Sequence, residues 1–161
     1  MAKRRRTLPR RWVDINDTMR EVFDFISVQA SARNVALYLN PSPEPLRVKG
    51  DSVQLQQVIM NLILNSMDAM VAMPNGRTVI GRTKMDGGSS AVISISDSGP
   101  GIPSEKLKEI FDPFFTTKKQ GMGIGLSIAR TIVQAHKGRI WAENQAEGGA
   151  VFHLSLPLAL S

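Results

Sequence analysis

The sequence contains no cysteine, which excludes a disulfide framework and a metal site built from thiolates. Its apolar stretches are interrupted by Asn, Asp or Gly well before the roughly 20 residues that a membrane span requires. The basic N-terminus leads into Trp12, Val13 and Asp14 rather than into an apolar segment, so no signal peptide is expected. We therefore expect a cytoplasmic domain without membrane contact, whether or not a longer parent protein is anchored.

Acidic residues are absent from the first eleven positions, which hold six of the positive charges. Without these six, the chain has 14 basic and 14 acidic residues, so its formal net charge of +6 belongs to this arm. No aromatic residues interleave the arginines to form a stacking platform for single strands, and no nucleic-acid partner is expected. We interpret residues 1–13 as a basic linker remnant and residues 14–161 as one domain.

Hydrophobic periodicity and turn residues predict three helices and a sheet. The order of elements predicts an α+β fold, a two-layer sandwich in which a mixed, mostly antiparallel sheet of about five strands packs on three helices. The predicted helices cover 14–33, 51–73 and 124–136, with a helical turn at 104–110, and the predicted strands cover 35–39, 46–48, 78–85, 91–97, 139–143 and 150–156.

The second predicted helix is apolar nearly all round but carries one polar face. Gln54, Gln57, Asn61, Asn65 and Asp68 are spaced by three or four residues, so they share that face. An amide oxygen can bind magnesium, which takes oxygen ligands and keeps waters and phosphates in its shell. On the helix alone, a magnesium site and a plain solvent-facing stripe remain open.

A turn with two glycines follows the predicted strand 91–97. Asp97 is delivered into the sequence Ser-Gly-Pro-Gly-Ile, in which Gly99 and Gly101 permit close approach of a ligand. A carboxylate at a strand end can accept a hydrogen bond from an exocyclic amine such as that of adenine, and Ile102 offers an apolar contact to a ring. An ordinary turn would look the same, so this motif is weak by itself.

A second glycine motif opens the last predicted helix. Gly121, Gly123 and Gly125 place backbone N–H groups at a helix N-terminus, which favours anions, and Lys118 and Lys119 lie just before them. A Walker loop is absent, and no strand runs directly into the glycines as a dinucleotide fingerprint requires. The motif therefore predicts a phosphate site of another kind.

In their order and spacing, these blocks and the Phe-rich segment 111–118 resemble the catalytic ATP-binding domain of bacterial sensor histidine kinases. That family shares a superfamily with DNA gyrase, the heat-shock chaperone ATPases and the mismatch-repair ATPases, and the resemblance covers about residues 12–157. It implies a Bergerat-type ATP-binding fold and a pocket for ATP and magnesium. The residues that it assigns to this pocket are Asn61, Asn65, Asp68, Ala69, Asp97, Gly99, Gly101, Ile102, Phe114, Thr116, Thr117, Lys118, Gly121, Gly123, Gly125 and Leu126.

The resemblance also implies roles within the pocket. Asn61, Asn65 and Lys118 would be the catalytic residues, with Asn65 as the magnesium ligand and Asp97 as the group that recognises adenine. The superfamily's ATPases carry a glutamate as general base four positions before the magnesium asparagine. Here that position is Asn61, which cannot accept a proton at neutral pH, so a kinase is expected rather than a hydrolase.

The expected activity is transfer of the ATP γ-phosphate to a histidine on a separate dimerisation domain, from which a response regulator receiver domain takes it. Both histidines of this chain, His136 and His153, are interpreted as structural, so the acceptor is expected outside the chain. The fragment is expected to be monomeric. Two alternatives remain: an anti-sigma-type protein serine kinase, and a non-catalytic nucleotide-binding docking module.

Overall fold

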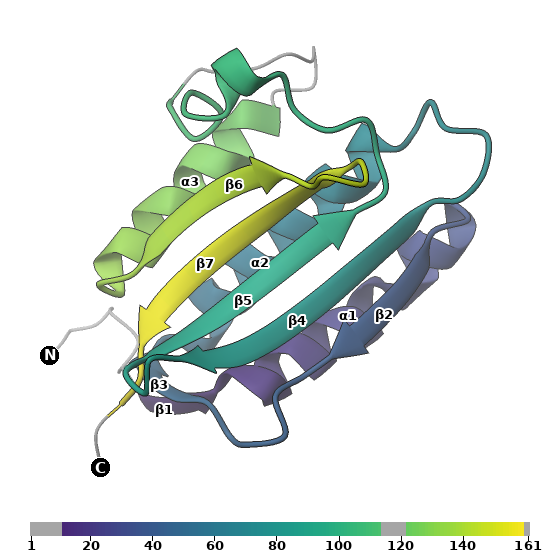
Figure 1. The fold of residues 1–161 in the computed structure, drawn as a ribbon. Coiled ribbons are helices and arrows are strands. Elements are labelled where there is room, and N and C mark those ends of the chain that lie inside the picture. The colour runs from purple at the N-terminus through teal and green to yellow at the C-terminus, as the bar shows by residue number, and fades with distance from the viewer. Residues whose placement is uncertain (1–10, 114–121, 160–161) are drawn as a thin grey trace, which may run out of the picture.

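The chain forms two layers, a twisted sheet and three helices that cover one of its faces (Figure 1). The computed structural model describes residues 11–113 and 122–159. In chain order the elements are β1 (Arg11–Asp14), α1 (Ile15–Ala32), β2 (Ala36–Asn40), β3 (Arg47–Gly50), α2 (Ser52–Ala69), β4 (Thr78–Asp86), β5 (Ser90–Asp97), the 3-10 turn η1 (Ser104–Lys106), α3 (Met122–Ala135), β6 (Arg139–Asn144) and β7 (Ala150–Pro157).

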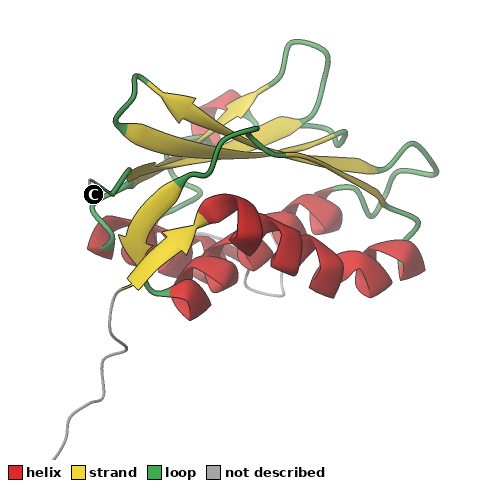
Figure 2. Ribbon diagram, turned by 90° about the horizontal axis from the view of Figure 1, so that it is seen from below, coloured by secondary structure: helices red, strands yellow, loops and turns green. Residues whose placement is uncertain are grey.

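The main sheet has the strand order β2-β4-β5-β7-β6. The β2–β4 pair is parallel, and the other three neighbouring pairs are antiparallel. Figure 2 shows α1, α2 and α3 on the same side of this sheet. The predicted two-layer α+β sandwich with a mixed, mostly antiparallel sheet is therefore confirmed.

Helix α1 begins where the sequence predicts it, because Asp14 is a suitable N-cap. The Asp14 carboxylate accepts hydrogen bonds from the backbone N–H groups of Asn16 (3.0 Å) and Leu46 (3.2 Å). From there, apolar residues at helical spacing face the sheet and are almost fully buried: Ile15, Met19, Val22, Phe23, Ile26 and Ala30.

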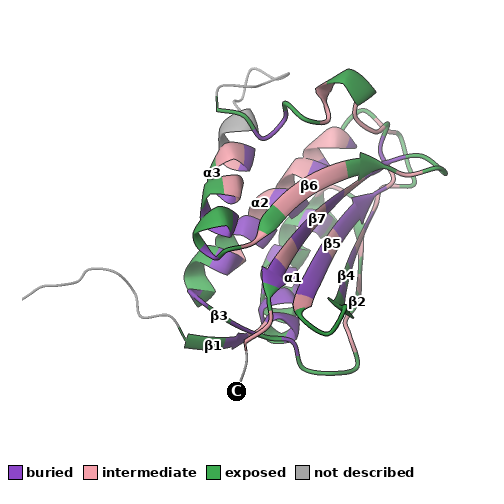
Figure 3. Ribbon diagram, turned by 60° about the vertical axis from the view of Figure 1, so that its left-hand side comes forward, coloured by how far each residue is buried: buried purple, intermediate pink, exposed green. Residues whose placement is uncertain are grey.

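The core lies between the sheet and the helices, as the buried stretches of β5 and β7 show in Figure 3. Alternation along the strands sends Ile93 and Ile95 inward, and the same holds for Phe152 and Leu154 on the paired strand. Each such side chain contributes about 1.5–3 kcal/mol when it is removed from water. This packing fixes the apolar side of α2, and the polar side of that helix is left half-exposed.

Strand β1 was not predicted. Residues 11–13, which the sequence interpretation assigns to the linker, pair with β3 in an antiparallel two-stranded sheet, with Val13 opposite Val48. Val13 is only 9% exposed. A strand of four residues directly after an arginine-rich stretch carries too little alternation to be recognised from sequence.

Helix α2 ends at Ala69, about one turn before the predicted end near residue 73. Beyond Ala69 the chain tightens into bonds between residues three apart, such as Met73 N–H to the Met70 carbonyl (2.9 Å). The carbonyls of Val71 and Met73 then accept hydrogen bonds from the Arg77 guanidinium instead of from further helical N–H groups. An arginine four to six residues further along the chain thus provides the donors that a longer helix would otherwise supply.

Candidate functional site

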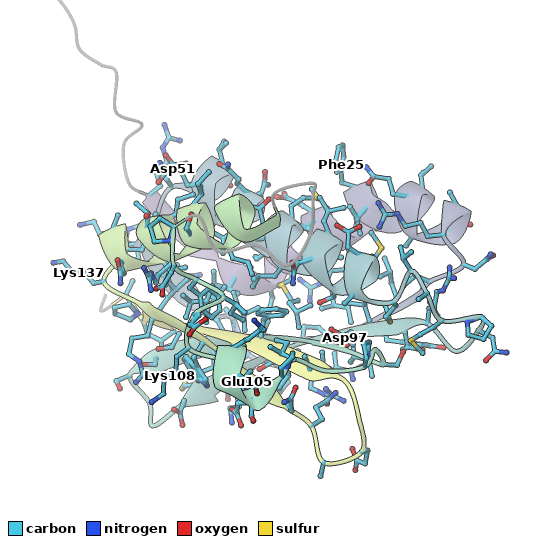
Figure 4. All side chains as sticks on the ribbon, turned by 90° about the horizontal axis from the view of Figure 1, so that it is seen from above. Phe25, Asp51, Asp97, Glu105, Lys108 and Lys137 are labelled. Atoms are coloured by element: carbon cyan, nitrogen blue, oxygen red, sulfur yellow. The ribbon has the colours of Figure 1, made fainter. Side chains whose placement is uncertain are left out.

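Three elements that are far apart in sequence bring most of the predicted site residues together. Helix α2 carries Asn61 and Asn65, β5 ends at Asp97, and the first turns of α3 carry Gly125. Figure 4 shows Asp97 at the carboxyl end of its strand, next to the helix layer. The Asp97 turn meets the end of α2, because a Cβ at Gly99 would come within 3.2 Å of the Met70 side chain.

Asp97 is buried, with 5% of its surface exposed, and one of its carboxylate oxygens is held by the backbone. Its Oδ1 accepts hydrogen bonds from the N–H groups of Gly99 (2.8 Å) and Ala150 (3.2 Å). Burial raises the pKa of Asp97 above its ordinary value, while these two hydrogen bonds and the nearby Ser66 hydroxyl lower it to a smaller extent. The second oxygen, Oδ2, accepts no hydrogen bond among the described residues.

Ser66 lies on α2 beside this carboxyl group and is fully buried. Its hydroxyl is close enough to the Asp97 carboxyl group to lower the pKa of that group, yet it forms no hydrogen bond of standard geometry with any group in the described part of the chain. A buried, unpaired hydroxyl costs on the order of 1–3 kcal/mol, so it calls for a partner. Together, a free hydroxyl and a free carboxylate oxygen fit a ligand that presents a donor next to an acceptor, as the edge of adenine does.

The geometry of the turn after Asp97 favours glycine at both predicted positions. A Cβ at Gly99 would lie 3.1 Å from Asp97 Oδ1, and Gly101 has a φ of +85°, which side chains disfavour. Ile102 is half-buried and packs against the core, so one side of it remains available for an apolar contact.

The two asparagines of α2 lie half-buried, and only one of them has a protein partner among the described residues. Asn61 Nδ2 donates to the Gly125 carbonyl (3.3 Å), which connects α2 to the glycine-rich start of α3. The Asn65 side chain makes no hydrogen bond within the described part of the chain. Asp68, one turn further, forms an ion pair with Arg33 at the end of α1 (2.8 Å) and is not part of a bare polar stripe. Ala69 is half-buried beside the turn, since its carbonyl lies 3.6 Å from the Cβ position of Gly99.

The remaining predicted residues divide into two groups. Leu126 is 5% exposed and belongs to the hydrophobic core, so the structure places it under the site rather than on its surface. Gly123 lies in the first turn of α3. Phe114, Thr116, Thr117, Lys118 and Gly121 lie outside the described residues.

Sequence reasoning missed three residues at this site. Ser66 gave no signal, because a serine in an apolar helix looks like any small core residue. Asn144 and Gln145, at the end of β6, form hydrogen bonds with the backbone of the Asp97 turn. Polar residues before a turn are common, so only the fold identifies these contacts.

A comparison with protein-family models matches residues 50–160 to a family described as histidine kinase-, DNA gyrase B- and HSP90-like ATPases. This match covers more than half of the chain and includes α2, the Asp97 turn and α3. The chain belongs to this family of ATPases.

Its relatives are sensor histidine kinases. The sensor protein FixL of Bradyrhizobium diazoefficiens is 41% identical over 130 residues, which are 81% of this chain and 26% of FixL. Among solved structures, the catalytic domain of the histidine kinase ThkA has a TM-score of 0.82 and 33% identity, over 94% of this chain and 97% of that domain. In ThkA crystallised in complex with the response regulator protein TrrA, the match has a TM-score of 0.79 and 31% identity, over 93% of this chain and 42% of that one.

The chain therefore corresponds to the ATP-binding catalytic domain of histidine kinases, as the resemblance predicts. It spans between 15% and 33% of the length of the first curated relatives it matches. Within residues 11–113 and 122–159, no helix is long and apolar enough to cross a membrane. The described side chains also include no group of three or more His, Asp or Glu residues that could hold a metal ion.

Proposed function

We propose that this domain binds ATP with magnesium between α2, the Asp97 turn and the start of α3, and presents the γ-phosphate to a histidine on another domain. The proposed recognition of adenine rests on the hydrogen bonds of the Asp97 carboxyl group. Two backbone N–H groups occupy Oδ1, while Oδ2 and the adjacent Ser66 hydroxyl have no hydrogen-bond partner among the described residues. An exocyclic amine is the donor that Oδ2 lacks, and a ring nitrogen beside that amine is an acceptor for Ser66, directly or through one water.

Magnesium is proposed to bind through the Asn65 side chain. Asn65 faces the same side of α2 as Asn61 and has a free amide among the described residues. The described region offers no cluster of acidic or imidazole ligands that would hold the ion without a nucleotide. A single neutral oxygen ligand suits an ion whose remaining ligands are phosphates and waters.

No general base for the activation of water is present at position 61, where the superfamily's ATPases carry one. Asn61 cannot accept a proton at neutral pH, and its Nδ2 is engaged by the Gly125 carbonyl. Catalysis would then consist of positioning ATP and neutralising charge around a phosphoryl group that passes to an external nucleophile. Lys118, which the resemblance places in the lid, is proposed as one source of that positive charge.

The acceptor histidine would lie outside this chain, because both of its histidines have structural partners. His136 is 4% exposed, and both of its ring nitrogens are hydrogen-bonded, to the Ile132 carbonyl and to the Asp51 N–H. His153 contacts Ser94 and Glu143 on the face of the sheet opposite the helices. We propose that a separate dimerisation domain carries the acceptor histidine. By analogy with the ThkA–TrrA complex, a response regulator would then receive the phosphoryl group from that histidine.

The decisive experiment is a calorimetric titration of the chain with a non-hydrolysable ATP analogue and magnesium. We expect binding in the micromolar to sub-millimolar range that is lost in Asp97→Asn. The asparagine must keep its oxygen toward the two backbone N–H groups, so its NH₂ would face the adenine amine, donor against donor. Asp86→Asn, an exposed aspartate at the end of β4, serves as the matched control and should bind like the wild type.

Two results would contradict the proposal. Equal affinity in Asp97→Asn and the wild type would remove Asp97 from adenine recognition. An absence of binding in the wild type would favour the docking-module alternative. The serine-kinase alternative has no supporting contact among the described residues, and phosphate on a serine of a partner protein would revive it.

A further inference from the structure

The last residue of β6 holds the Asp97 turn by a two-point contact. Asn144 Oδ1 accepts a hydrogen bond from the Ile102 N–H (2.8 Å), and Asn144 Nδ2 donates to the Ile102 carbonyl (2.7 Å). One side-chain amide thus satisfies both backbone groups of a residue 42 positions away, much as a neighbouring strand would. Both bonds are short enough to be well formed.

The contact with Asn144 leaves little space for a side chain at position 101. A Cβ at position 101 would lie 2.9 Å from Asn144 Oδ1, which is too close for an ordinary contact. The backbone of Gly101, with a φ of +85°, passes over the amide and carries the chain into Ile102. Glycine therefore suits this position because of its positive φ and because a side chain would displace the Asn144 amide, whether or not a ligand approaches it.

The same hairpin holds the other end of the turn. Gln145 Nε2 donates to the Asp97 carbonyl (3.1 Å), and the Ala150 N–H donates to Asp97 Oδ1 (3.2 Å). Gly149 passes directly against the Asp97 carbonyl, where no Cβ would fit. Residues 144–150 therefore fix the turn at both of its ends, Asp97 and Ile102.

We propose that Asn144 is a positioning residue that sets the selectivity of the site for adenine over guanine. The inference rests on the proposed function, since it takes the turn to be the wall that meets the base. Asn144 acts through Gly101 and Ile102 and touches neither the nucleotide nor the phosphates. Guanine carries a carbonyl where adenine carries its amine, and that carbonyl would face the free oxygen of Asp97.

Rigidity is what makes this repulsion effective. A carboxylate on a mobile turn can retreat from a guanine carbonyl by a small backbone shift, whereas a carboxylate on a turn fixed at both ends cannot. A fixed turn also strengthens the binding of adenine itself, because adenine binds best when Asp97 and Ile102 are already in place. Loss of the Asn144 contact should therefore reduce the affinity for ATP, while the weak affinity for GTP stays the same or rises.

A contact that only stabilises the surface of the fold would give a different result. Asn144 is exposed, so its hydrogen bonds contribute modestly to the free energy of unfolding. If the contact only closes a loop, its removal lowers stability slightly and leaves the ratio of ATP to GTP affinity unchanged. The ratio is thus the readout that separates the two roles.

The test compares Asn144→Ala with Asn40→Ala in the full chain. Asn40 is the last residue of β2, the opposite edge strand, is also exposed and makes no side-chain hydrogen bond among the described residues. Calorimetry with non-hydrolysable ATP and GTP analogues should show an ATP affinity reduced about tenfold in Asn144→Ala, with a correspondingly smaller ratio, and no change in Asn40→Ala. Amide hydrogen exchange at Ile102 should also accelerate in Asn144→Ala only.

Asn144→Asp provides a second variant, because it keeps an acceptor for the Ile102 N–H but loses the donor to the Ile102 carbonyl. It should reduce the ratio of affinities as well. If the wild type binds the ATP analogue and both Asn144 variants keep the wild-type ratio, the positioning role is wrong and the proposed function stands. If the wild type binds neither analogue, the proposed function fails and the inference falls with it.

Discussion

The carboxyl group of Asp97 is held by contacts that orient it without neutralising its charge. No cation is paired with it among the described residues, and burial raises its pKa although two N–H groups point at Oδ1. The Ser66 hydroxyl offsets this rise only in part, and it makes no hydrogen bond of standard geometry within the described part of the chain. Stability is thus given up at one residue that the proposed ligand would satisfy, a pattern common at binding sites.

This arrangement predicts a pH dependence of stability with a defined sign. Because the pKa of Asp97 is higher in the folded protein, the folded chain keeps this proton at pH values at which the unfolded chain has lost it. The contribution is favourable below the ordinary pKa and is lost as the pH rises through the raised pKa. Urea unfolding of the wild type and Asp97→Asn should therefore show the wild type losing stability relative to the variant from acidic to neutral pH.

The neutral asparagine keeps an oxygen for the Gly99 and Ala150 N–H groups and offers an NH₂ group toward Ser66. At neutral pH the variant should be at least as stable as the wild type, although it does not bind the nucleotide. A wild type that gains stability relative to the variant as the pH rises would show that folding favours the charged carboxylate, which is the opposite of the expected pKa shift.

At the scale of elements, periodicity and caps made the helices predictable, and long-range contacts made the rest unpredictable. Asp14 and Asp51 both cap helices as expected; Asp51 accepts from the Val53 (3.0 Å) and Gln54 (3.1 Å) N–H groups. The early end of α2 depends on Arg77, whose guanidinium reaches back to carbonyls that local sequence leaves to the helix. Local patterns indicate burial and caps, but they do not indicate which side chain satisfies a given backbone group.

The end of α3 is joined to the beginning of α2 by one buried imidazole. His136 Nδ1–H donates to the Ile132 carbonyl (2.9 Å), and Nε2 accepts from the Asp51 N–H (3.1 Å), so the ring is the neutral Nδ1–H tautomer. The sequence interpretation expected a structural histidine. The structure shows a neutral ring whose acceptor nitrogen accepts a hydrogen bond from the first residue before another helix.

His136→Ala should therefore destabilise the domain by about 2–4 kcal/mol, because it leaves a cavity and an unpaired Asp51 N–H. Urea unfolding measures this change. Gln134→Ala, an exposed position on the same helix, is the control and should stay within about 0.5 kcal/mol of the wild type. A loss for His136→Ala as small as that of the control would mean that the imidazole does not join the two helices.

At the scale of the whole molecule, the sequence predicted the two-layer fold and the turn after Asp97 with its two glycines. It could not supply the strand order, in which β2 lies parallel to β4, because register follows from packing over long distances. Nor could it show that Asn144 and Ile102 meet, since their contact depends on β7 lying between β6 and β5. Motif order was informative because the motifs lie in the second half of α2, at the end of β5 and at the start of α3, which the fold brings together.

Strand β1 bears on where the folded domain begins. The sequence interpretation starts the domain at residue 14, whereas β1 adds Arg11 opposite Gly50 and the buried Val13 opposite Val48. β3 leads directly into Asp51, the cap of α2 and partner of His136, and Figure 4 shows Asp51 and Lys137 together at the end of the molecule away from Asp97. Loss of β1 should therefore weaken the support of α2 at its beginning.

A chain that starts at residue 11 should keep the free energy of unfolding of the full chain within about 0.5 kcal/mol, since the residues removed are expected to be linker. A chain that starts at residue 14 loses the burial of Val13 and the strand pairing, and should be less stable by about 2 kcal/mol. Urea unfolding of the two truncated chains decides between the boundaries. Equal stability would place the start of the domain at residue 14, and a loss already in the longer chain would mean that residues 1–10 contribute to the fold.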